Sequence, residues 1–181
     1  MTAVRAAARP AAGAPSVAPL LHGLPPVIDR HTRVVVLGSF PGEASLAAAQ
    51  YYAHPRNQFW PLLSALLADD LAALPYAARL RRLARHRVGL WDVIAACRRS
   101  GSLDSAIRDA QYNDLAGLRQ RAPGLRLVLH NGAQSARMLP HTLALGVPAL
   151  RLPSTSPANA GWSFERKLQA WRDAFALAGV D

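Results

Sequence analysis

The sequence predicts a three-layer α/β/α sandwich with a central, mostly parallel β-sheet. Three short runs rich in apolar residues, at 33–37, 125–130 and 149–152, have the composition of strands that are buried on both faces. Helical patterns of hydrophobicity separate these runs along the chain. Strands that alternate with helices are typical of a parallel sheet covered by helices on both sides.

Helices are expected at 58–67, 71–87, 104–118, 133–139 and 164–177, and the third is expected to break near Asn113. Ser163 directly precedes the last helix and is a residue type that caps helix N-termini. In open parallel sheets, ligands bind beyond the carboxyl ends of the strands. Those ends are the loops 38–42, 130–132 and 153–157, which we therefore expect to form the functional site.

The chain is expected to form a single domain, 27–181, after a leader, 1–26. The leader is rich in Ala and Pro and has no periodicity, so it cannot bury enough apolar area to offset its ordering entropy. We expect it to be flexible and dispensable. The chain has 181 residues, 51% of them hydrophobic, which is enough for a sizeable core. No apolar run approaches the about 18 residues of a membrane span, so we expect no membrane partner.

The charge balance is strongly basic. Lys and Arg number 21 against 11 Asp and Glu, which leaves a formal net charge of +10. This surplus favours a polyanionic partner, such as nucleic acid or a membrane surface. A GC-rich genome would explain Arg in place of Lys but not an excess of basic over acidic groups. A basic surface that is merely solvated is the alternative.

Several common functional motifs are absent from the sequence. The single cysteine, Cys97, excludes an intrachain disulfide and an all-cysteine iron–sulfur or zinc site, and it is typical of a reducing compartment such as the cytoplasm. The closest histidines, His22 and His31, are nine residues apart, so local His–His metal motifs are missing. The sequence has no GxGxxG turn, GK[ST] loop or GxSxG elbow. We therefore expect neither a metal nor a cofactor.

Two segments remain as carriers of function. The first is the turn GSFPG at 38–42, and the second is YYAHPRNQFW at 51–60, which leads into a predicted helix. Aromatic residues beside Arg56 suit base stacking and phosphate contact. The structural alternatives are a simple strand-ending turn for the first segment and, for Phe59 and Trp60, the buried face of the helix.

These segments resemble the uracil-DNA glycosylase superfamily, and most closely its hypoxanthine-DNA glycosylase branch. The resemblance lies in GSFPGEASL, YYAHPRNQFW, LWDV, GSLDSAI, HNG and LPSTSPAN, in this order, and it extends from about Arg33 to the C-terminus. It implies a glycosylase fold, a DNA substrate and cleavage of an N-glycosidic bond without a cofactor.

The sequence departs from the uracil-directed pattern at two positions. Phe40 stands where those relatives carry a catalytic Asn or Asp, and Leu152 stands where they carry a polar His or Asn. In the hypoxanthine branch, the resemblance implies that Asn57 positions the attacking water. Asn57 is also a residue type that caps helices, so a structural role at the start of the 58–67 helix is open, and the two roles are compatible.

The remaining candidate residues follow the strand ends and the aromatic segment. Base binding is assigned to Phe40 by stacking, to Asn131 through its side-chain amide, and to Ser39 and Tyr52 at the pocket. DNA binding is assigned to Ser154, Thr155, Ser156 and Arg56, because hydroxyls and guanidinium groups contact phosphates. The alternatives are a strand-end turn at Asn131 and local turns in the 153–157 loop.

The sequence as a whole predicts a monofunctional DNA glycosylase that removes hypoxanthine from deoxyinosine in DNA. The expected partner is DNA containing deaminated bases, and the protein is expected to be a monomer in the cytoplasm, associated with the nucleoid. One alternative is a uracil/thymine mismatch glycosylase, against which Phe40 and Leu152 count. Another is a non-catalytic nucleic-acid-binding module, which the missing Asn or Asp at position 40 would suit.

Overall fold

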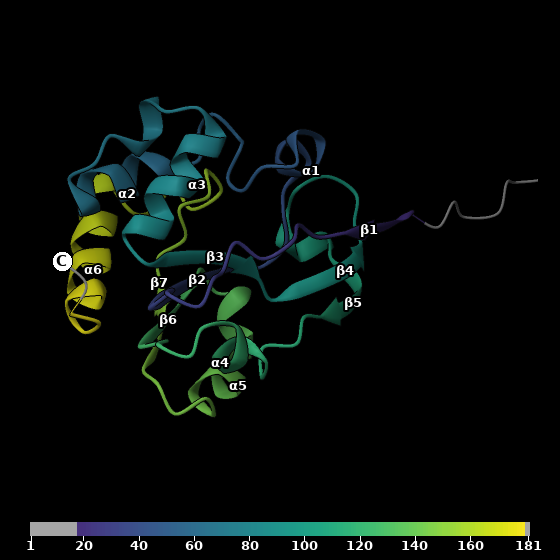
Figure 1. The fold of residues 1–181 in the computed structure, drawn as a ribbon. Coiled ribbons are helices and arrows are strands. Elements are labelled where there is room, and N and C mark those ends of the chain that lie inside the picture. The colour runs from purple at the N-terminus through teal and green to yellow at the C-terminus, as the bar shows by residue number, and fades with distance from the viewer. Residues whose placement is uncertain (1–17, 180–181) are drawn as a thin grey trace, which may run out of the picture.

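A computed structural model describes residues 18–179 of the chain. Its centre is a four-stranded parallel sheet in the order β3-β2-β6-β7 (Figure 1). The strands are β2 (Val34–Gly38), β3 (Val88–Asp92), β6 (Leu127–Asn131) and β7 (Ala149–Leu152). Because β2 has β3 on one side and β6 on the other, the strand order reverses at β2, and ligands bind at such a point.

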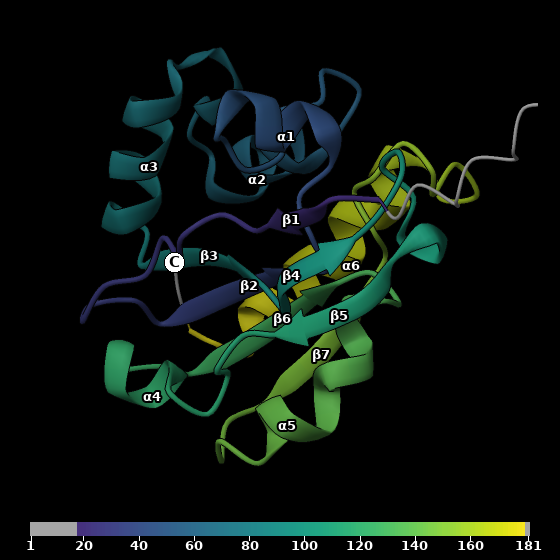
Figure 2. The ribbon, with the colours of Figure 1, turned by 90° about the vertical axis from the view of Figure 1, so that its right-hand side faces the viewer.

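Helices cover both faces of the sheet (Figure 2). The side chains of Val34 and Val36 face a core shared with α2 (Phe59–Leu67), α3 (Tyr76–Arg85) and α6 (Phe164–Ala176). Those of Val35 and Leu37 face the opposite core, to which α4 (Leu118–Arg121) and the pair η3 (Ser135–Met138) and α5 (Leu139–Leu143) contribute. The expected three-layer α/β/α sandwich is confirmed.

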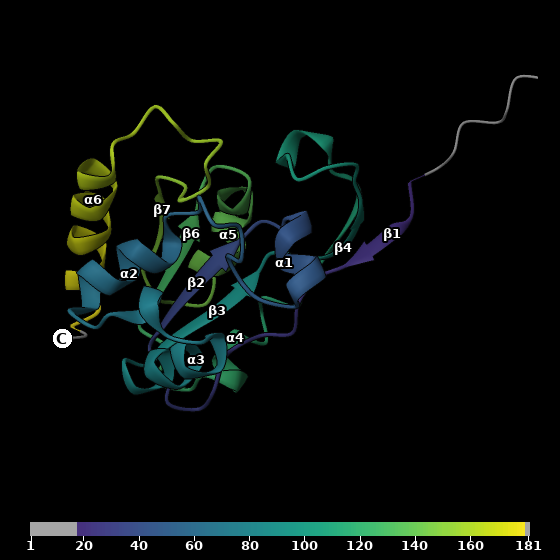
Figure 3. The same ribbon diagram turned by 90° about the horizontal axis from the view of Figure 1, so that it is seen from above.

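A second, three-stranded antiparallel sheet extends from the first (Figure 3). It consists of β1 (Leu20–His22), β4 (Ile94–Arg98) and β5 (Arg108–Tyr112), with β4 in the centre. Only Val93 separates β4 from β3, and its N–H donates to the Gly38 carbonyl at 2.9 Å. This sheet places the 99–107 loop beside the carboxyl end of β2.

The helix predictions have mixed outcomes. Helices α2 and α6 occur where expected, and the Ser163 hydroxyl accepts from Arg166 N–H at 3.3 Å.

The other predicted helices differ from the structure. The 71–87 helix is interrupted at Pro75, between η1 (Leu71–Ala73) and α3. The 104–118 helix is wrong: η2 (Asp104–Ala106) and β5 occupy most of it, because the backbone of Arg108–Tyr112 is extended and pairs with β4. The 133–139 pattern spans η3 and the start of α5. A short helix, α1 (Glu43–Ala48), was not predicted.

The folded region begins earlier than the expected boundary at Val27. Leu20–His22 pairs with Ala96, Cys97 and Arg98 of β4 as strand β1. The Tyr51 hydroxyl also contacts the carbonyls of Leu24 and Pro25, at 3.3 and 3.1 Å. Residues 18–26 are therefore part of the domain. The rest of the expected leader, 1–17, lies outside the described residues.

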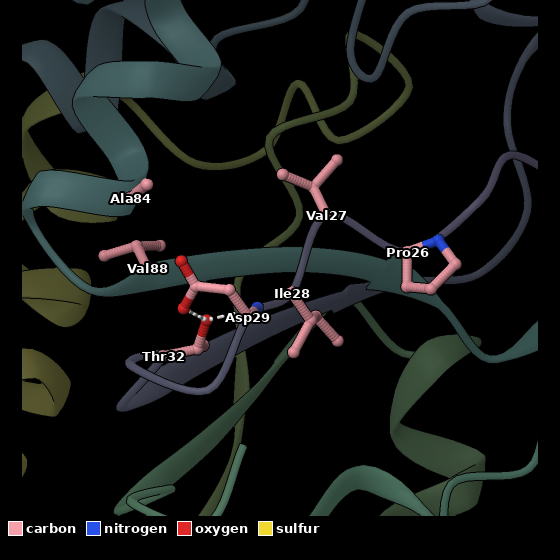
Figure 4. A pocket seen from close by; sticks show the side chains of 7 residues that line it. All are labelled: Pro26, Val27, Ile28, Asp29, Thr32, Ala84 and Val88. Carbon is pink, nitrogen blue, oxygen red and sulfur yellow. Dashed lines mark hydrogen bonds between the residues drawn. The ribbon is translucent and has the colours of Figure 1, made fainter. Parts of the chain in front are cut away.

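The segment after Pro26 runs antiparallel beside the edge strand β3. Val27 and Leu90, in the middle of β3, exchange two backbone hydrogen bonds, of 2.8 and 2.9 Å. A hollow of about 320 Å³ lies beside this segment, and the hydroxyl of Thr32 donates to Asp29 at 3.1 Å within it (Figure 4). Its lining is mostly aliphatic. Within residues 18–179, no helix is long and apolar enough to cross a membrane.

We expect a protein truncated to start at Val27 to be less stable than the full chain. The truncation removes β1 from the edge of β4 and leaves the buried Tyr51 hydroxyl without its carbonyl partners, and such an unpaired group costs about 1–3 kcal/mol. Thermal unfolding of the two proteins measures the difference. A truncation that starts at Ala18 is the matched control, because it retains every contact described above. Equal melting temperatures for all three proteins would contradict this boundary.

Candidate active site

The carboxyl ends of the strands open into one cavity of about 980 Å³. Gly38 pairs in register with Asp92 at the ends of β2 and β3, and Asn131 pairs with Leu152 at the ends of β6 and β7. Every site residue predicted from the sequence lines this cavity: Ser39, Phe40, Tyr52, Arg56, Asn57, Asn131, Ser154, Thr155 and Ser156. The fold thus brings together segments that are up to 117 positions apart (156 minus 39).

Asn131 connects three segments of the cavity wall. Its Nδ2 donates to the hydroxyls of Thr155 and Tyr52, at 2.9 and 3.3 Å, and its Oδ1 accepts from Thr155 N–H at 2.9 Å. Because a primary amide has two N–H donors, both are now used. The amide therefore holds the walls of the cavity together, and reading a base with its donor, as the sequence predicted, would require one of these bonds to be exchanged.

Asn57 lies where the cavity meets the start of α2. Its Oδ1 accepts from Phe59 N–H at 3.0 Å, which fixes the turn into the helix. Its Nδ2 has no hydrogen-bond partner within residues 18–179, and the second lone pair of Oδ1 is also available. The structural role considered for Asn57 is thus present, and the side chain retains both a donor and an acceptor for water.

Phe40 is largely buried beneath the cavity. Its side chain is 6% exposed, packs in the same core as Val35 and Leu37, and has the Arg99 guanidinium 5.0 Å from its ring centre. A cation over one face of the ring makes that face unavailable for a base. The stacking role predicted for Phe40 is therefore limited to the small part of the ring that reaches the cavity.

The 153–157 loop is fixed by hydrogen bonds from its neighbours. Gln58 N–H donates to the Thr155 carbonyl at 3.0 Å, and Asn159 Nδ2 donates to the Ser154 carbonyl at 3.0 Å. Thr155 is 0% exposed, and its hydroxyl accepts from Asn131, so this hydroxyl is not placed to contact a phosphate as the sequence predicted. Ser154 and Ser156 are half-buried at the surface of the same loop.

Tyr52 and Ser39 both line the cavity and are held in place by their neighbours. Tyr52 has a φ of +55°, a left-handed conformation that is uncommon for a non-glycine residue, and its ring stacks on Phe59 with 3.7 Å between centroids. The Ser39 hydroxyl donates to Asp104 at 2.7 Å. Arg56 is exposed at the rim. A strained backbone that is held by stacking is common where a side chain serves a site.

The sequence reasoning did not single out Asp92, which ends β3 inside the cavity. The residue is 4% exposed, and its Oδ2 is buried without a hydrogen-bond partner. A Cβ at Gly38 would collide with Asp92 Oδ1, so the glycine makes room for the carboxyl. Burial first, and then Asp104, raises the pKa of Asp92 to about 7, while Arg99 acts in the opposite direction. Its place in LWDV, at the end of an apolar run, was the signal that could have identified it.

The only lysine of the chain, Lys167, was also overlooked as a positioning residue. It is 2% exposed, and its Nζ donates to Gln58 Oε1 at 2.8 Å and to the Asn159 carbonyl at 3.0 Å. Burial lowers the pKa of Lys167. The side chain ties α6 to the start of α2 and to the loop after β7. Its amine is thus occupied and does not line the cavity.

His130 lies beneath the site as a buried, neutral side chain. Its two ring nitrogens contact the hydroxyls of Ser135 and Thr142, at 2.9 and 2.8 Å, and the Ser135 hydroxyl donates to the Leu37 carbonyl. Burial lowers the pKa of His130 to about 4. In the described part of the chain, no three His, Cys, Asp or Glu residues are grouped so as to hold a metal ion.

We expect His130 to make the folded protein less stable in acid. Its pKa falls from 6.5 to about 4 on folding, so the unfolded state binds more protons between these values, and the free energy of unfolding decreases as the pH falls through that range. The measurement is denaturant unfolding at several pH values for wild type and His130→Gln. The difference in the free energy of unfolding between wild type and the variant should become smaller toward pH 4. A difference that is independent of pH would show that His130 titrates alike in both states.

Fold and site together define an α/β protein with a cavity at the point where the strand order reverses. A family comparison gives the family: residues 25–175 match the uracil DNA glycosylase superfamily, and the chain belongs to it. Two relatives named hypoxanthine DNA glycosylase, from Methanosarcina barkeri and Methanosarcina acetivorans, are 42% and 38% identical over 153 residues. Each alignment covers 84% of this chain and 96% of the relative.

A solved structure shows the same fold. It is the solution NMR structure of a candidate uracil DNA glycosylase from Methanosarcina acetivorans, with a TM-score of 0.80 and 36% sequence identity. The match covers 88% of this chain and 99% of the other. The resemblance found in the sequence motifs is therefore confirmed at the level of the superfamily, of named relatives and of the fold.

Proposed function

We propose that this protein is a monofunctional DNA glycosylase that hydrolyses the N-glycosidic bond of deoxyinosine and releases hypoxanthine. The observation that carries the proposal is the single cavity that unites all the motifs shared with hypoxanthine DNA glycosylases. Phe40 occupies the position of the uracil-directed Asn or Asp in that cavity, and its ring offers no strong hydrogen bond to water.

The reaction requires a flipped nucleotide and a positioned water molecule. Extruding a base from the duplex costs a few kcal/mol, and less for a mispaired one such as inosine. As the bond from C1′ to the base breaks, the sugar becomes oxocarbenium-like and the base takes the electron pair. Water then adds to C1′, and the base acquires a proton. Water supplies both the hydroxyl group added to C1′ and the proton taken by the base, and the step needs no other reactant.

The DNA would approach at the rim of the cavity. Arg56 is exposed there, Ser154 and Ser156 lie beside it, and the net charge of +10 favours phosphate contacts. Leu103 and Trp162 also line the cavity and are exposed, which suits contact with unstacked bases. We infer that the protein acts as a monomer on DNA of the nucleoid.

The proposed reaction ends at an intact abasic site. Cleavage of the strand by a lyase step needs an amine that forms a Schiff base with the opened sugar. The one lysine side chain of the protein, Lys167, is buried and hydrogen-bonded to Gln58 and Asn159, away from the cavity. The structure thus offers no lysine for that step.

An activity panel tests the function directly. On duplexes that contain inosine, uracil or xanthine, we expect the highest single-turnover rate on inosine and a product that is cleaved only after alkali. Borohydride trapping on inosine DNA should leave no covalent adduct. Faster excision of uracil would favour a uracil/thymine glycosylase, binding without excision of any base would favour a non-catalytic module, and a trapped adduct would contradict the monofunctional reaction.

Replacing Asn57 by Ala should reduce base excision far more than DNA binding. The amide is proposed to hold the attacking water, and an interaction made in the transition state affects the rate of the chemical step. The loss of the turn at Phe59 alone would lower stability by about 1 kcal/mol. Single-turnover rates and DNA affinity of the folded variant measure the two effects. An unchanged rate would remove Asn57 from the mechanism.

Asn57→Asp is the matched control for this variant. Aspartate retains the oxygen that accepts from Phe59 N–H and can accept a hydrogen bond from water, so it should be more active than Asn57→Ala. Equal rates for the two variants would indicate that the Nδ2 donor, rather than the oxygen, carries the effect.

A further inference from the structure

The Asp92 carboxyl lines the cavity and has no role in the reaction proposed above. It is 4% exposed and has an oxygen buried without a hydrogen-bond partner. No cation lies within salt-bridge distance of it among residues 18–179, although Arg99 is near enough to act on its charge. An unpaired buried polar group is costly to a fold, and proteins retain such groups for a function.

The surroundings of Asp92 favour its neutral form. Among the strand ends and loops around it, the groups that act on its charge are Asp104 and Arg99. Burial first, and Asp92 in turn, raise the pKa values of Tyr51, Tyr52 and Tyr76, which lie nearby, so these tyrosines carry no charge near neutral pH. Burial and Asp104 raise the pKa of Asp92 to about 7, against the opposite effect of Arg99. At and below this pH, one carboxyl oxygen donates a hydrogen bond and the other accepts one.

This pair of hydrogen-bonding groups complements the edge of hypoxanthine. The base presents a donor, N1–H, beside an acceptor, the carbonyl oxygen O6. A neutral carboxyl accepts from N1–H and donates to O6, which closes a cyclic pair. Because Oδ2 is buried, the Asp92 side chain must turn for both of its oxygens to reach the base. The Asn131 amide has no donor left for this edge, because both of its N–H groups bind Tyr52 and Thr155, and the free groups of Asn57 are assigned to water.

We propose that the Asp92 carboxyl binds N1–H and O6 of the flipped hypoxanthine and is a specificity-determining residue of the site. This inference rests on the proposed glycosylase function. In the reaction, the bond from C1′ to N9 breaks and the electron pair leaves with the base. Negative charge reaches O6, where the Asp92 O–H strengthens its hydrogen bond. Water adds to C1′ and its proton passes through solvent to the released base, while Asp92 retains its own proton.

The protonation of Asp92 determines whether it helps or hinders the departing base. A neutral carboxyl stabilises the developing charge on O6, as hydrogen-bond donors do for oxyanions. An ionised carboxylate would repel the same charge in a cavity sheltered from water. Excision by wild type should therefore slow as the pH rises through about 7, with the carboxyl deprotonating. A general base would give the opposite slope, because it acts only when ionised.

Two substitutions separate the hydrogen-bonding role from other roles. Asp92→Asn keeps an acceptor and a donor in the same positions and does not titrate, so it should excise hypoxanthine within about tenfold of wild type and lose the decline above pH 7. Asp92→Ala removes both groups and should lower the single-turnover rate on inosine on the order of 100-fold. On a duplex with purine 2′-deoxyriboside, which lacks O6 and N1–H, the effect of Asp92→Ala should shrink to less than about tenfold.

Asp104→Asn provides a second test of the same group. Removing the nearby carboxylate should lower the pKa of Asp92, so the pH at which wild-type excision declines should move downward. Thermal unfolding of each variant confirms that it is folded. The substitution removes a charge and not a contact with Asp92. If the role of Asp92 were purely structural, the pH at which excision declines would therefore not move.

Different experimental outcomes test the glycosylase function and the role of Asp92. If wild type excises no base from any duplex, the function is wrong. If wild type excises hypoxanthine but Asp92→Asn is as inactive as Asp92→Ala, or if the rate rises through pH 7, Asp92 acts as a base and the inference is overturned. Equal rates for wild type and a folded Asp92→Ala would also overturn it, by showing that the carboxyl does not contact the base.

Discussion

The parallel sheet determines where this protein can place functional polar side chains. Strands β2, β3 and β6 are buried on both faces throughout their length, so a polar side chain within them would lack solvent and most would lack partners. Polar groups are tolerated where the strands end, or where they have partners, as His130 has in β6. Asp92 and Asn131 are the last residues of β3 and β6, and Gly38 ends β2 between them. Burial of the strands on both faces disfavours polar groups within them, and the parallel pairing brings the polar residues at the strand ends to one edge. The buried sheet and the polar cavity therefore follow from the same topology.

Hydrogen bonds of two side chains hold the loops at that edge. Asn131 joins β6 to Tyr52 and to the loop after β7, and Lys167 joins α6 to α2 and to the same loop. Both donate two hydrogen bonds in a region sheltered from water, where a lost partner would leave an unsatisfied group. The cavity is thus held in shape before a substrate enters, which spares the binding step the entropy of ordering its walls.

The sequence could predict the features that depend on local patterns. The apolar strand runs, α2, α6 and the convergence of Ser39, Asn131 and Ser154 at the strand ends follow from periodicity and from parallel topology, whereas the role of Asn57 was implied only by the family resemblance. Strand β5 could not be predicted, because its residues are mostly exposed and have no alternating apolar pattern. Likewise, only the structure shows that Thr155 turns inward to Asn131 and that Asp92 has an oxygen without a partner.

The site combines neutral polar groups inside with positive charge outside. Asn57, Asn131, Tyr52 and His130 are uncharged near neutral pH in their surroundings, since burial raises the pKa of Tyr52 and lowers that of His130. Such a cavity avoids the large desolvation penalty of buried ions, and Arg56 adds positive charge at the exposed rim. The Phe40 ring brings no charge to the cavity wall. The carboxylate of Asp104 also lines the cavity, where it accepts from Ser39, so a base that departs as an anion avoids a second negative charge only if Asp92 keeps its proton.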